Sequence, residues 1–302
     1  MISYFFGVEF MQPTSAKMVP TAPLGHGSAR WVGRTWARIS YGRKVEPTWL
    51  EANEITLPVA DLDPALEGLR IAHLTDFHGG EHLPQHYLPE VVERTLSLKP
   101  DLIALTGDFV HKGYRHVTDV AQALGSLKAP LGTFAVLGNH DFSVRNALGW
   151  RRHRGLHLAV TDSLETRGIR VLRNTSAILD HQGVPFQVAG IDDLWSGECD
   201  PVAALRGLCP NTPRLVLAHN PLTVEQLGKE RCDLMLSGHT HGGQVNWPGL
   251  GRLFIGKNAR RLPSGMCRHE NKPVYVNKGI GYGLRFRFGV RPEVAVFTLR
   301  KA

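Results

Sequence analysis

The chain carries a series of short motifs built from carboxylate, amide and imidazole side chains, which together could bind metal ions. No cysteine belongs to them, so the donor set favours borderline cations such as Mn, Fe or Zn over soft ones. Two adjacent ions of this kind are a common device for in-line attack on phosphorus. In chain order, the motifs are Asp76-Phe77-His78, Gly107-Asp108, Gly138-Asn139-His140-Asp141, His219-Asn220 and Gly238-His239-Thr240-His241.

Each motif follows a short apolar run that is typical of a central strand in an α/β layer. The first three motifs are spaced by about 30 residues, which is the length of a strand–helix–strand unit. Helices are predicted near Pro89–Leu98 and Val117–Leu127. Loops at the carboxyl ends of strands usually bind the substrate in such sheets, so the motifs are expected to meet there. The predicted strands cover residues 69–74, 102–105, 133–137, 214–218 and 233–236, with a last strand at 294–299.

The content and order of these motifs resemble the calcineurin-like metallophosphoesterases over roughly residues 55–300. The resemblance implies an α/β fold, a four-layer αββα sandwich with a dimetal site on loops at the strand carboxyl ends. Three further segments are similar to the bacterial membrane-associated phosphodiesterase branch, which includes UDP-diacylglucosamine pyrophosphatase-like enzymes. These segments are residues 189–195 (AGIDDLW), residues 277–283 (NKGIGYG) and Arg291-Pro292-Glu293.

The resemblance also implies a role for each motif residue. One metal would be held by Asp76, His78, Asp108 and His241, and the other by Asp108, Asn139, His219 and His239. Asp108 would bridge the two ions, because a carboxylate has two oxygens. A hydroxide that bridges the metals would attack phosphorus. His140 would be the general acid for the leaving oxygen, and Asp141 would orient His140.

Simpler interpretations exist for the separate pieces. The Gly-Asn-His-Asp motif could be a tight turn, because Gly and Asn tolerate left-handed backbone. His239 and His241 could be strand residues on opposite faces, although the neighbouring glycines favour a loop. His73 is interpreted as a packed histidine or one that supports a ligand. Asn220 and Gln244 are at most supporting residues, and Trp195 is interpreted mainly as a packing aromatic.

The chain has 302 residues, which suits one α/β domain of about 250 residues with an extension. The predicted division is a basic, aromatic N-terminal extension at 1–54 and a metallophosphoesterase domain at 55–302. Residues 142–186 are basic and are predicted to form a cap or side layer beside the site. The cysteines, Cys199, Cys209, Cys232 and Cys267, lack paired ligand spacing. We interpret them as reduced thiols of a cytoplasmic protein.

The formal net charge of +8 favours phosphate substrates and anionic surfaces. Arg30, Arg34 and Arg38 would share one face of a helix that also contains tryptophans, a composition that suits a membrane interface. Two further segments combine basic with apolar residues, at 253–261 and 285–288. The hypothesis is peripheral binding to the inner membrane, and the alternative is that these are solvated basic faces and core aromatics. Residues 1–11 are too short to span a bilayer and lack the basic start of a signal peptide.

The leading functional hypothesis is a dimetal phosphodiesterase or pyrophosphatase that acts on a phospholipid or a nucleotide-linked lipid. Mn is the favoured metal, although Fe and Zn accept the same ligands. The alternative is a broad phosphodiesterase for cyclic nucleotides or nucleic acid, which basic charge alone cannot separate from a lipid enzyme. No nucleic-acid-binding module is recognised, so a nucleic-acid partner is not expected. A metal-binding scaffold without catalysis is less favoured, because no expected ligand is missing.

Overall fold

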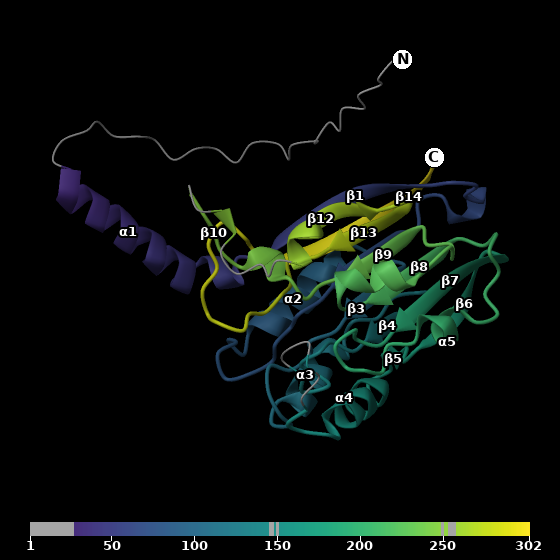
Figure 1. Cartoon of the computed structure of the whole chain (residues 1–302), viewed down its shortest axis with the longest axis horizontal. Coiled ribbons are helices and arrows are strands. Elements are labelled where there is room, and N and C mark those ends of the chain that lie inside the picture. Colours follow the sequence, from purple (N-terminus) through teal and green to yellow (C-terminus); the bar gives the residue numbers. More distant parts are fainter. Residues whose placement is uncertain (1–26, 145–147, 149–150, 249–250, 253–257) are drawn as a thin grey trace, which may run out of the picture. The chain divides into compact units, whose positions relative to one another are not determined.

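The apolar runs identified in the sequence form the central strands of two six-stranded sheets (Figure 1). This computed structural model describes residues 27–144, 148, 151–248, 251–252 and 258–302. The first sheet has the order β1 (Glu51–Val59), β14 (Glu293–Lys301), β2 (Arg70–Leu74), β3 (Leu102–Thr106), β4 (Thr133–Val136) and β5 (Arg170–Val171). The second has the order β12 (Gly265–His269), β13 (Lys272–Val276), β9 (Leu234–Ser237), β8 (Arg214–Ala218), β7 (Val184–Ile191) and β6 (Thr175–His181).

Parallel pairing aligns the strands that precede the motifs. Strands β2, β3, β4 and β5 are parallel in the first sheet, as are β7, β8, β9 and β13 in the second. The antiparallel strand β14 separates β2 from β1. A short hairpin of β10 (Asn246–Trp247) and β11 (Gly251–Arg252) lies outside both sheets. The parallel order brings the ends of consecutive motif strands to one edge of each sheet.

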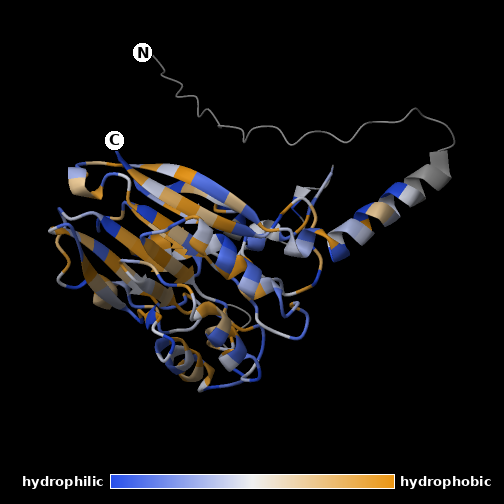
Figure 2. Cartoon of the chain, turned by 180° about the vertical axis from the view of Figure 1, so that it is seen from behind, coloured by the Kyte–Doolittle hydropathy of each residue, from blue (hydrophilic) through white to orange (hydrophobic). Residues whose placement is uncertain are grey.

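Alternate side chains of each central strand enter different cores, which explains why these strands are apolar throughout. In β3, Leu102 and Ala104 pack between the sheets, whereas Ile103 and Leu105 pack toward the helices. Strand β8 alternates in the same way between the inter-sheet core and the outer face of the second sheet. Figure 2 shows hydrophobic colouring along the strands of both sheets.

Helices cover the outer faces of both sheets, so the four-layer arrangement is confirmed. The first sheet is covered by α2 (Tyr87–Ser97), α3 (Val117–Leu124) and α4 (Leu156–Glu165). The layer over the second sheet is thinner and consists of α5 (Pro201–Leu205) and a 3₁₀ helix at Pro221–Gln226. The helices predicted at 89–98 and 117–127 correspond to α2 and α3, and both end earlier than predicted.

Residues 142–186 do not form a cap in the part of the segment that the structure describes. They contain α4, whose Leu156, Val160 and Leu164 are buried in the helix-side core. The segment then supplies β5 and β6, which are edge strands of the two sheets. Its basic residues suggested a separate layer, but Arg152 and Arg154 lie at exposed positions of a segment that otherwise packs into the fold.

The compact unit that contains the strands runs from Arg38 to Ala302, so it starts before the 54/55 boundary that the sequence suggested. The buried carboxylate of Glu46 accepts a hydrogen bond of 2.6 Å from the backbone N–H of Val290. Helix α1 (Gly27–Lys44) crosses the start of this unit, and residues 1–11 lie outside the described residues. Within the described ranges, every helix is too short or too polar to cross a lipid bilayer.

Candidate metal centre

The predicted ligands all lie just beyond the carboxyl ends of parallel strands. Three of these strands belong to the first sheet and two to the second, so the site is shared between the sheets. Asp76 and His78 follow β2, Asp108 follows β3, Asn139 follows β4, His219 follows β8, and His239 and His241 follow β9.

One group of side chains brings together Asp76, His78 and His241. The Nε2 atoms of the two histidines lie 2.8 Å apart, although they come from different sheets. Oδ1 of Asp76 lies 3.3 Å from Nε2 of His241 and 3.8 Å from Nε2 of His78. Three ligand atoms therefore face one small volume, as one metal site requires.

A second group brings together Asp108, Asn139, His219 and His239. Oδ2 of Asp108 lies 3.3 Å from Nε2 of His219, and Nδ1 of His239 lies 3.0 Å from Oδ1 of Asn139. The amide of Asn139 donates to the carbonyl of Val144, which turns its oxygen toward the site. The two histidine rings meet edge to face, with centroids 5.2 Å apart. The sequence-predicted ligands are thus brought together in both groups.

Asp108 lies between the groups, but its two oxygens are not equivalent. Oδ1 accepts a hydrogen bond of 2.9 Å from the backbone N–H of His140. Oδ2 lies 3.3 Å from Nε2 of His219 and 3.6 Å from Nε2 of His78, which belong to different groups. Only Oδ2 therefore faces both groups, whereas the sequence predicts that Asp108 uses both of its oxygens.

The ligand loops adopt a backbone conformation that is uncommon for residues with side chains. Asp76, His78, Asp108, His239 and His241 all have positive φ angles, between 45° and 69°. Such left-handed backbone costs on the order of 1–3 kcal/mol per residue and persists only where the surrounding structure fixes it. The same conformation also occurs away from the site, for example at Lys99 and Gln182, so it shows that neighbouring structure holds these loops.

Two motif glycines are required because the loops approach one another closely, between the two sheets at Gly238 and between the β3 and β4 loops of the first sheet at Gly138. A Cβ atom at Gly238 would overlap Oδ2 of Asp76, and one at Gly138 would overlap Oδ1 of Asp108. The N–H of His239 can therefore reach Oδ2 of Asp76, at 3.0 Å. These glycines belong to their motifs because any side chain would displace a ligand carboxylate.

The residues present fit a metal ion. The Nδ1 atoms of His78 and His241 are buried without a hydrogen-bond partner in the described structure, and so is Nε2 of His219. The Nδ1–H of His219 donates to the carbonyl of Thr106 at 2.7 Å, which leaves the Nε2 lone pair directed at the site. A second hydrogen bond of this kind is typical of histidine ligands.

Burial and opposite charges shift the pKa values of the acidic ligands in different directions. Burial raises the pKa of Asp76 to about 6. Burial also opposes ionisation of Asp108, but His219 and His140 nevertheless hold its pKa well below the usual value. Burial would lower the pKa of His219, but Asp108 and Asp76 raise it well above the ordinary value. Asp108 and His219 each favour the charged form of the other, and a histidine must lose its second proton before its nitrogen can bind a metal.

His140 is held by a carbonyl group, and the predicted role of Asp141 as its orienting partner is wrong. Nδ1 of His140 lies 2.8 Å from the carbonyl oxygen of His111, so Nδ1–H donates there and Nε2 is left for the site. The carboxylate of Asp141 instead accepts backbone N–H groups of Phe109, Val110 and Gly138. Asp141 therefore ties the β3 loop to the β4 loop. Burial raises its pKa to about 8.

The supporting residues that the sequence indicated have structural contacts. His73 is fully buried, with Nε2 2.8 Å from the Thr106 hydroxyl, which confirms a packed histidine. Trp195 packs edge to face on His239, with centroids 4.5 Å apart, and so restrains a predicted ligand. Asn220 accepts the N–H of Leu222 and caps a 3₁₀ helix. Gln244 donates to the carbonyls of Leu284 and Phe286.

Arg287 supports the site from inside the protein, although the sequence predicts that it lies on the surface. It is fully buried and donates to the carbonyls of Lys278, Gly279, Gly281 and Val290. The loop that it holds packs on the β2 loop, because Gly281 N–H donates to the carbonyl of Asp76 at 2.7 Å. Its partners are backbone carbonyls, which no sequence motif reveals.

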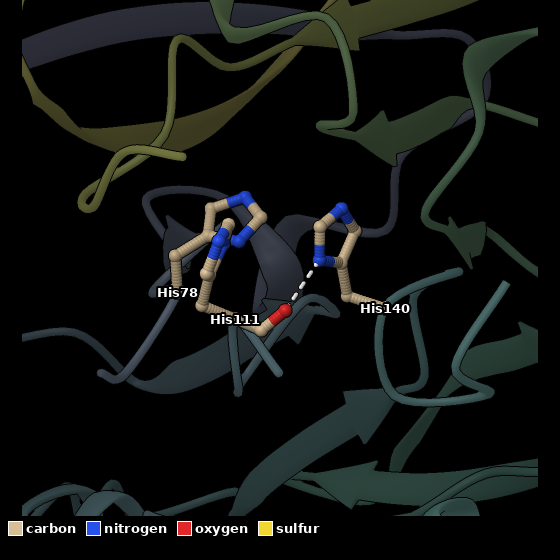
Figure 3. A group of neighbouring side chains, drawn as sticks. All are labelled: His78, His111 and His140. Carbon is tan, nitrogen blue, oxygen red and sulfur yellow. Dashed lines mark hydrogen bonds between the residues drawn. The ribbon is translucent and has the colours of Figure 1, made fainter. Parts of the chain in front are cut away.

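Two more groups near the site were not assigned a role from the sequence. His111 joins His78 and His140 in a cluster of three imidazoles (Figure 3). Asp193 follows β7 and is fully buried, and its Oδ1 accepts the N–H of Trp195 at 2.8 Å. Burial raises the pKa of Asp193 to about 7. In the sequence, His111 is marked only by its position shortly after the Gly107-Asp108 motif. Asp193 is marked only by its place in the segment at 189–195.

Comparison with known proteins gives matches over most of the chain. The profile of the calcineurin-like phosphoesterases matches residues 69–243. The phosphodiesterase YaeI of Escherichia coli (strain K12) is 33% identical over 297 residues, covering 96% of this chain and 98% of that protein. The uncharacterized metallophosphoesterase YkuE of Bacillus subtilis (strain 168) is 32% identical, with 86% and 89% covered. The UDP-2,3-diacylglucosamine pyrophosphatase LpxG of Chlamydia trachomatis is 28% identical, with 87% and 92% covered.

Replacement of Asp108 tests its predicted position between two ions. Asp108→Ala and the nearly isosteric Asp108→Asn should weaken the binding of both metals by more than about 100-fold, because a shared ligand loses its charge. Metal content per chain and calorimetric titration with Mn would measure the loss. Asp119→Ala, which removes an exposed carboxylate on α3, should leave both metals bound. Retention of two tightly bound ions by both Asp108 variants would contradict the bridge.

Proposed function

The chain belongs to the calcineurin-like phosphoesterase family, and on that premise we propose that it hydrolyses a phosphodiester or pyrophosphate bond in a phospholipid or nucleotide-linked lipid. The observation that supports the proposal is the convergence of carboxylate and imidazole groups from both sheets on Asp76 and Asp108. Asp76 lies in two groups of possible ligands, one with His78 and His241 and one with Asp108 and His219, and Oδ2 of Asp108 lies near both His78 and His219. A two-metal phosphoesterase needs this kind of arrangement.

Each group would hold one divalent ion. Asp76, His78 and His241 would bind the first, Asn139, His219 and His239 the second, and Asp108 both. Mn is favoured, because oxygen donors and imidazoles are combined without a thiolate. When bound, such ions neutralise charge on a phosphoryl group and lower the pKa of water. Only two of these ligands are anionic, so the loaded site would attract a phosphate.

His140 would supply the proton that the leaving oxygen needs. Its Nδ1–H is committed to the His111 carbonyl, so Nε2 is the atom directed to the substrate. The N–H of His140 is bound to Oδ1 of Asp108, which fixes the backbone of the acid relative to the metal ligands. The acid and the predicted bridge therefore belong to one rigid unit.

The proposed substrate class rests on the relatives and on the surface beside the site. One relative is named a phosphodiesterase, and another a pyrophosphatase of a diacylated nucleotide sugar. Leu284 follows Gly283, where an added Cβ atom would lie 3.6 Å from Cε1 of His111, and the Leu284 side chain is 63% exposed, so it could contact an apolar substrate group. A phosphodiesterase for cyclic nucleotides or nucleic acid is the second candidate, favoured only by the net charge of +8.

Hydrolysis of simple esters tests the proposed reaction. With Mn present, the protein should cleave bis(p-nitrophenyl) phosphate faster than p-nitrophenyl phosphate, and Asp108→Asn should abolish both activities. A panel of diacylated nucleotide sugars, phospholipids and cyclic nucleotides would then separate the two substrate classes. Faster cleavage of the monoester would count against a phosphodiesterase, and preference for cyclic nucleotides would support the second candidate.

Replacement of His140 tests its role as the acid. His140→Ala should lose about 10²–10⁴-fold in kcat while both metals remain bound, as expected for a proton donor. The loss should be larger for diphenyl phosphate than for bis(p-nitrophenyl) phosphate, because phenolate is the poorer leaving group. An equal loss on both diesters, or a loss of metal, would show that His140 has another role.

We also propose that a patch of basic and aromatic residues binds an anionic lipid surface. The patch consists of Arg38, Tyr41, Arg43, Lys44, Trp49, Trp247, Arg285 and Phe288. The guanidinium of Arg38 lies 5.8 Å from the Trp247 ring, which packs on Phe288. Arg43 and Lys44 follow Tyr41 on α1, and Arg285 lies three residues before Phe288; all three are exposed and bring positive charge to the segments that carry the rings.

Some predicted membrane-binding residues do not belong to this patch. The buried Arg287 cannot contact lipid, which corrects that part of the hypothesis. Lys257 lies outside the described residues, as do the side chains of Arg30 and Trp31. The cytoplasmic location stays a prediction.

Vesicle sedimentation tests the patch. The protein should sediment with vesicles that contain phosphatidylglycerol and less with neutral phosphatidylcholine vesicles, and added salt should release it. Charge reversal at Arg43 and Lys44 should remove most of this binding. The same reversal at Arg152 and Arg154, which are exposed outside the patch, is the matched control and should bind as the wild type does. Equal sedimentation with both lipids would refute the proposal.

A further inference from the structure

His111 lies inside the candidate site but belongs to neither predicted metal group. Its ring centroid lies 5.6 Å from that of His78 and 5.4 Å from that of His140. One ring nitrogen from each of the three residues lies within 4.8 Å of the others. Figure 3 shows the three side chains and the hydrogen bond from His140 to the His111 carbonyl, and the closest pair of rings is His78 and His140, with centroids 4.7 Å apart. His111 is therefore within reach of whatever the proposed acid and the metal ligand contact.

The backbone of His111 is held on both sides. Its N–H donates to the carbonyl of Gly79 at 3.0 Å, and the N–H of Gly79 donates to the carbonyl of Phe109 at 2.9 Å. Its carbonyl accepts the Nδ1–H of His140 at 2.8 Å. A residue that is fixed in this way presents its side chain with little loss of conformational entropy on binding.

His111 is partly exposed, as are His140 and the predicted ligands His239 and His241. Among the three clustered imidazoles, His78 is buried, whereas His111 and His140 are partly exposed. A Cβ atom at Gly283 would lie 3.6 Å from Cε1 of His111, so this side of the ring is bordered by a residue without a side chain. His111 and His140 are therefore the two rings of this cluster that solvent, and hence a substrate, can reach.

We propose that His111 is a substrate-contacting residue, whose imidazole donates a hydrogen bond to the phosphoryl group while its backbone carbonyl orients His140. This inference rests on the proposed function, because it assumes that a phosphoryl group binds beside His78 and His140. A single residue then links recognition of the phosphoryl oxygens to the position of the proton donor. Hydrogen bonds to charged groups are stronger than neutral ones, so the contact contributes measurably to binding.

The main competing interpretation is that His111, His78 and His140 bind an additional metal ion, since their nitrogens are close enough to do so. The two interpretations differ in what removal of the ring changes. A metal ligand would alter metal content, whereas a substrate contact would alter phosphate binding at constant metal content.

The experiment uses the full chain loaded with Mn and compares the wild type with His111→Ala and His111→Gln. It measures metal content per chain, the calorimetric Kd of inorganic phosphate, and kcat and KM for bis(p-nitrophenyl) phosphate. We expect His111→Ala to weaken phosphate binding and lower kcat/KM by about 10–100-fold, with metal content unchanged. The side-chain amide of His111→Gln can still donate a hydrogen bond, so it should recover part of the loss. His86→Ala, at an exposed histidine whose side chain makes no capping hydrogen bond to α2, should match the wild type.

Three results would overturn the inference. Phosphate binding and kinetics like those of the wild type in His111→Ala would exclude a substrate contact. Loss of a metal ion from both variants would assign His111 to metal binding. Equal losses in His111→Ala and a correctly folded His111→Gln would show that packing, not hydrogen bonding, matters. If the wild type cleaves no ester, the proposed function fails by itself, and the phosphate titrations still decide whether His111 contacts phosphate.

Discussion

The buried carboxylate of Asp108 connects the parts on which the site depends. Its Oδ1 accepts the N–H of His140, and its Oδ2 lies beside His78 and His219. One side chain thereby joins the loops that follow β2, β3, β4 and β8. A buried carboxylate without partners is costly, and Asp108 stays ionised only because these groups surround it. The fold must therefore bring both sheets together at Asp108. A bound metal ion would interact with the same carboxylate charge.

Neighbouring structure holds the loops around Asp108 in a strained backbone conformation. The left-handed backbone at Asp76, His78 and His239 is unfavourable unless neighbouring structure fixes it. Close contact at Gly238 holds a loop of the second sheet against a loop of the first. Close contact at Gly138 holds the loops after β3 and β4 against each other. Arg287 adds a further restraint through its bonds to backbone carbonyls. Rigid loops of this kind keep ligand atoms close before a metal binds, which reduces the entropy that binding must overcome.

The proposed role of His140 depends on its own motif and on a residue of another loop. His140 is recognisable as a candidate acid from its motif, but its orientation depends on the carbonyl of His111, which belongs to another loop. Asp141 seemed the natural partner because it is adjacent in sequence, yet adjacent residues at a turn need not face one another. Its carboxylate serves three backbone N–H groups instead. Similarly, Arg287 sits in an alternating basic and aromatic segment that suggested a surface, whereas its guanidinium is fully buried.

By itself, the sequence determined the strands that carry the motifs and the layered α/β fold, because apolar runs with a polar residue at their ends follow local rules. It also predicted the ligands, whose side chains lie close together at the ends of these strands. Only the tertiary structure decided which groups support them. The different contacts of the two Asp108 oxygens, the His111 carbonyl, the Arg287 contacts and the place of residues 142–186 all depend on pairings between segments far apart in the chain. Backbone carbonyls and loop contacts leave no signature in residue type, so no motif could have revealed them.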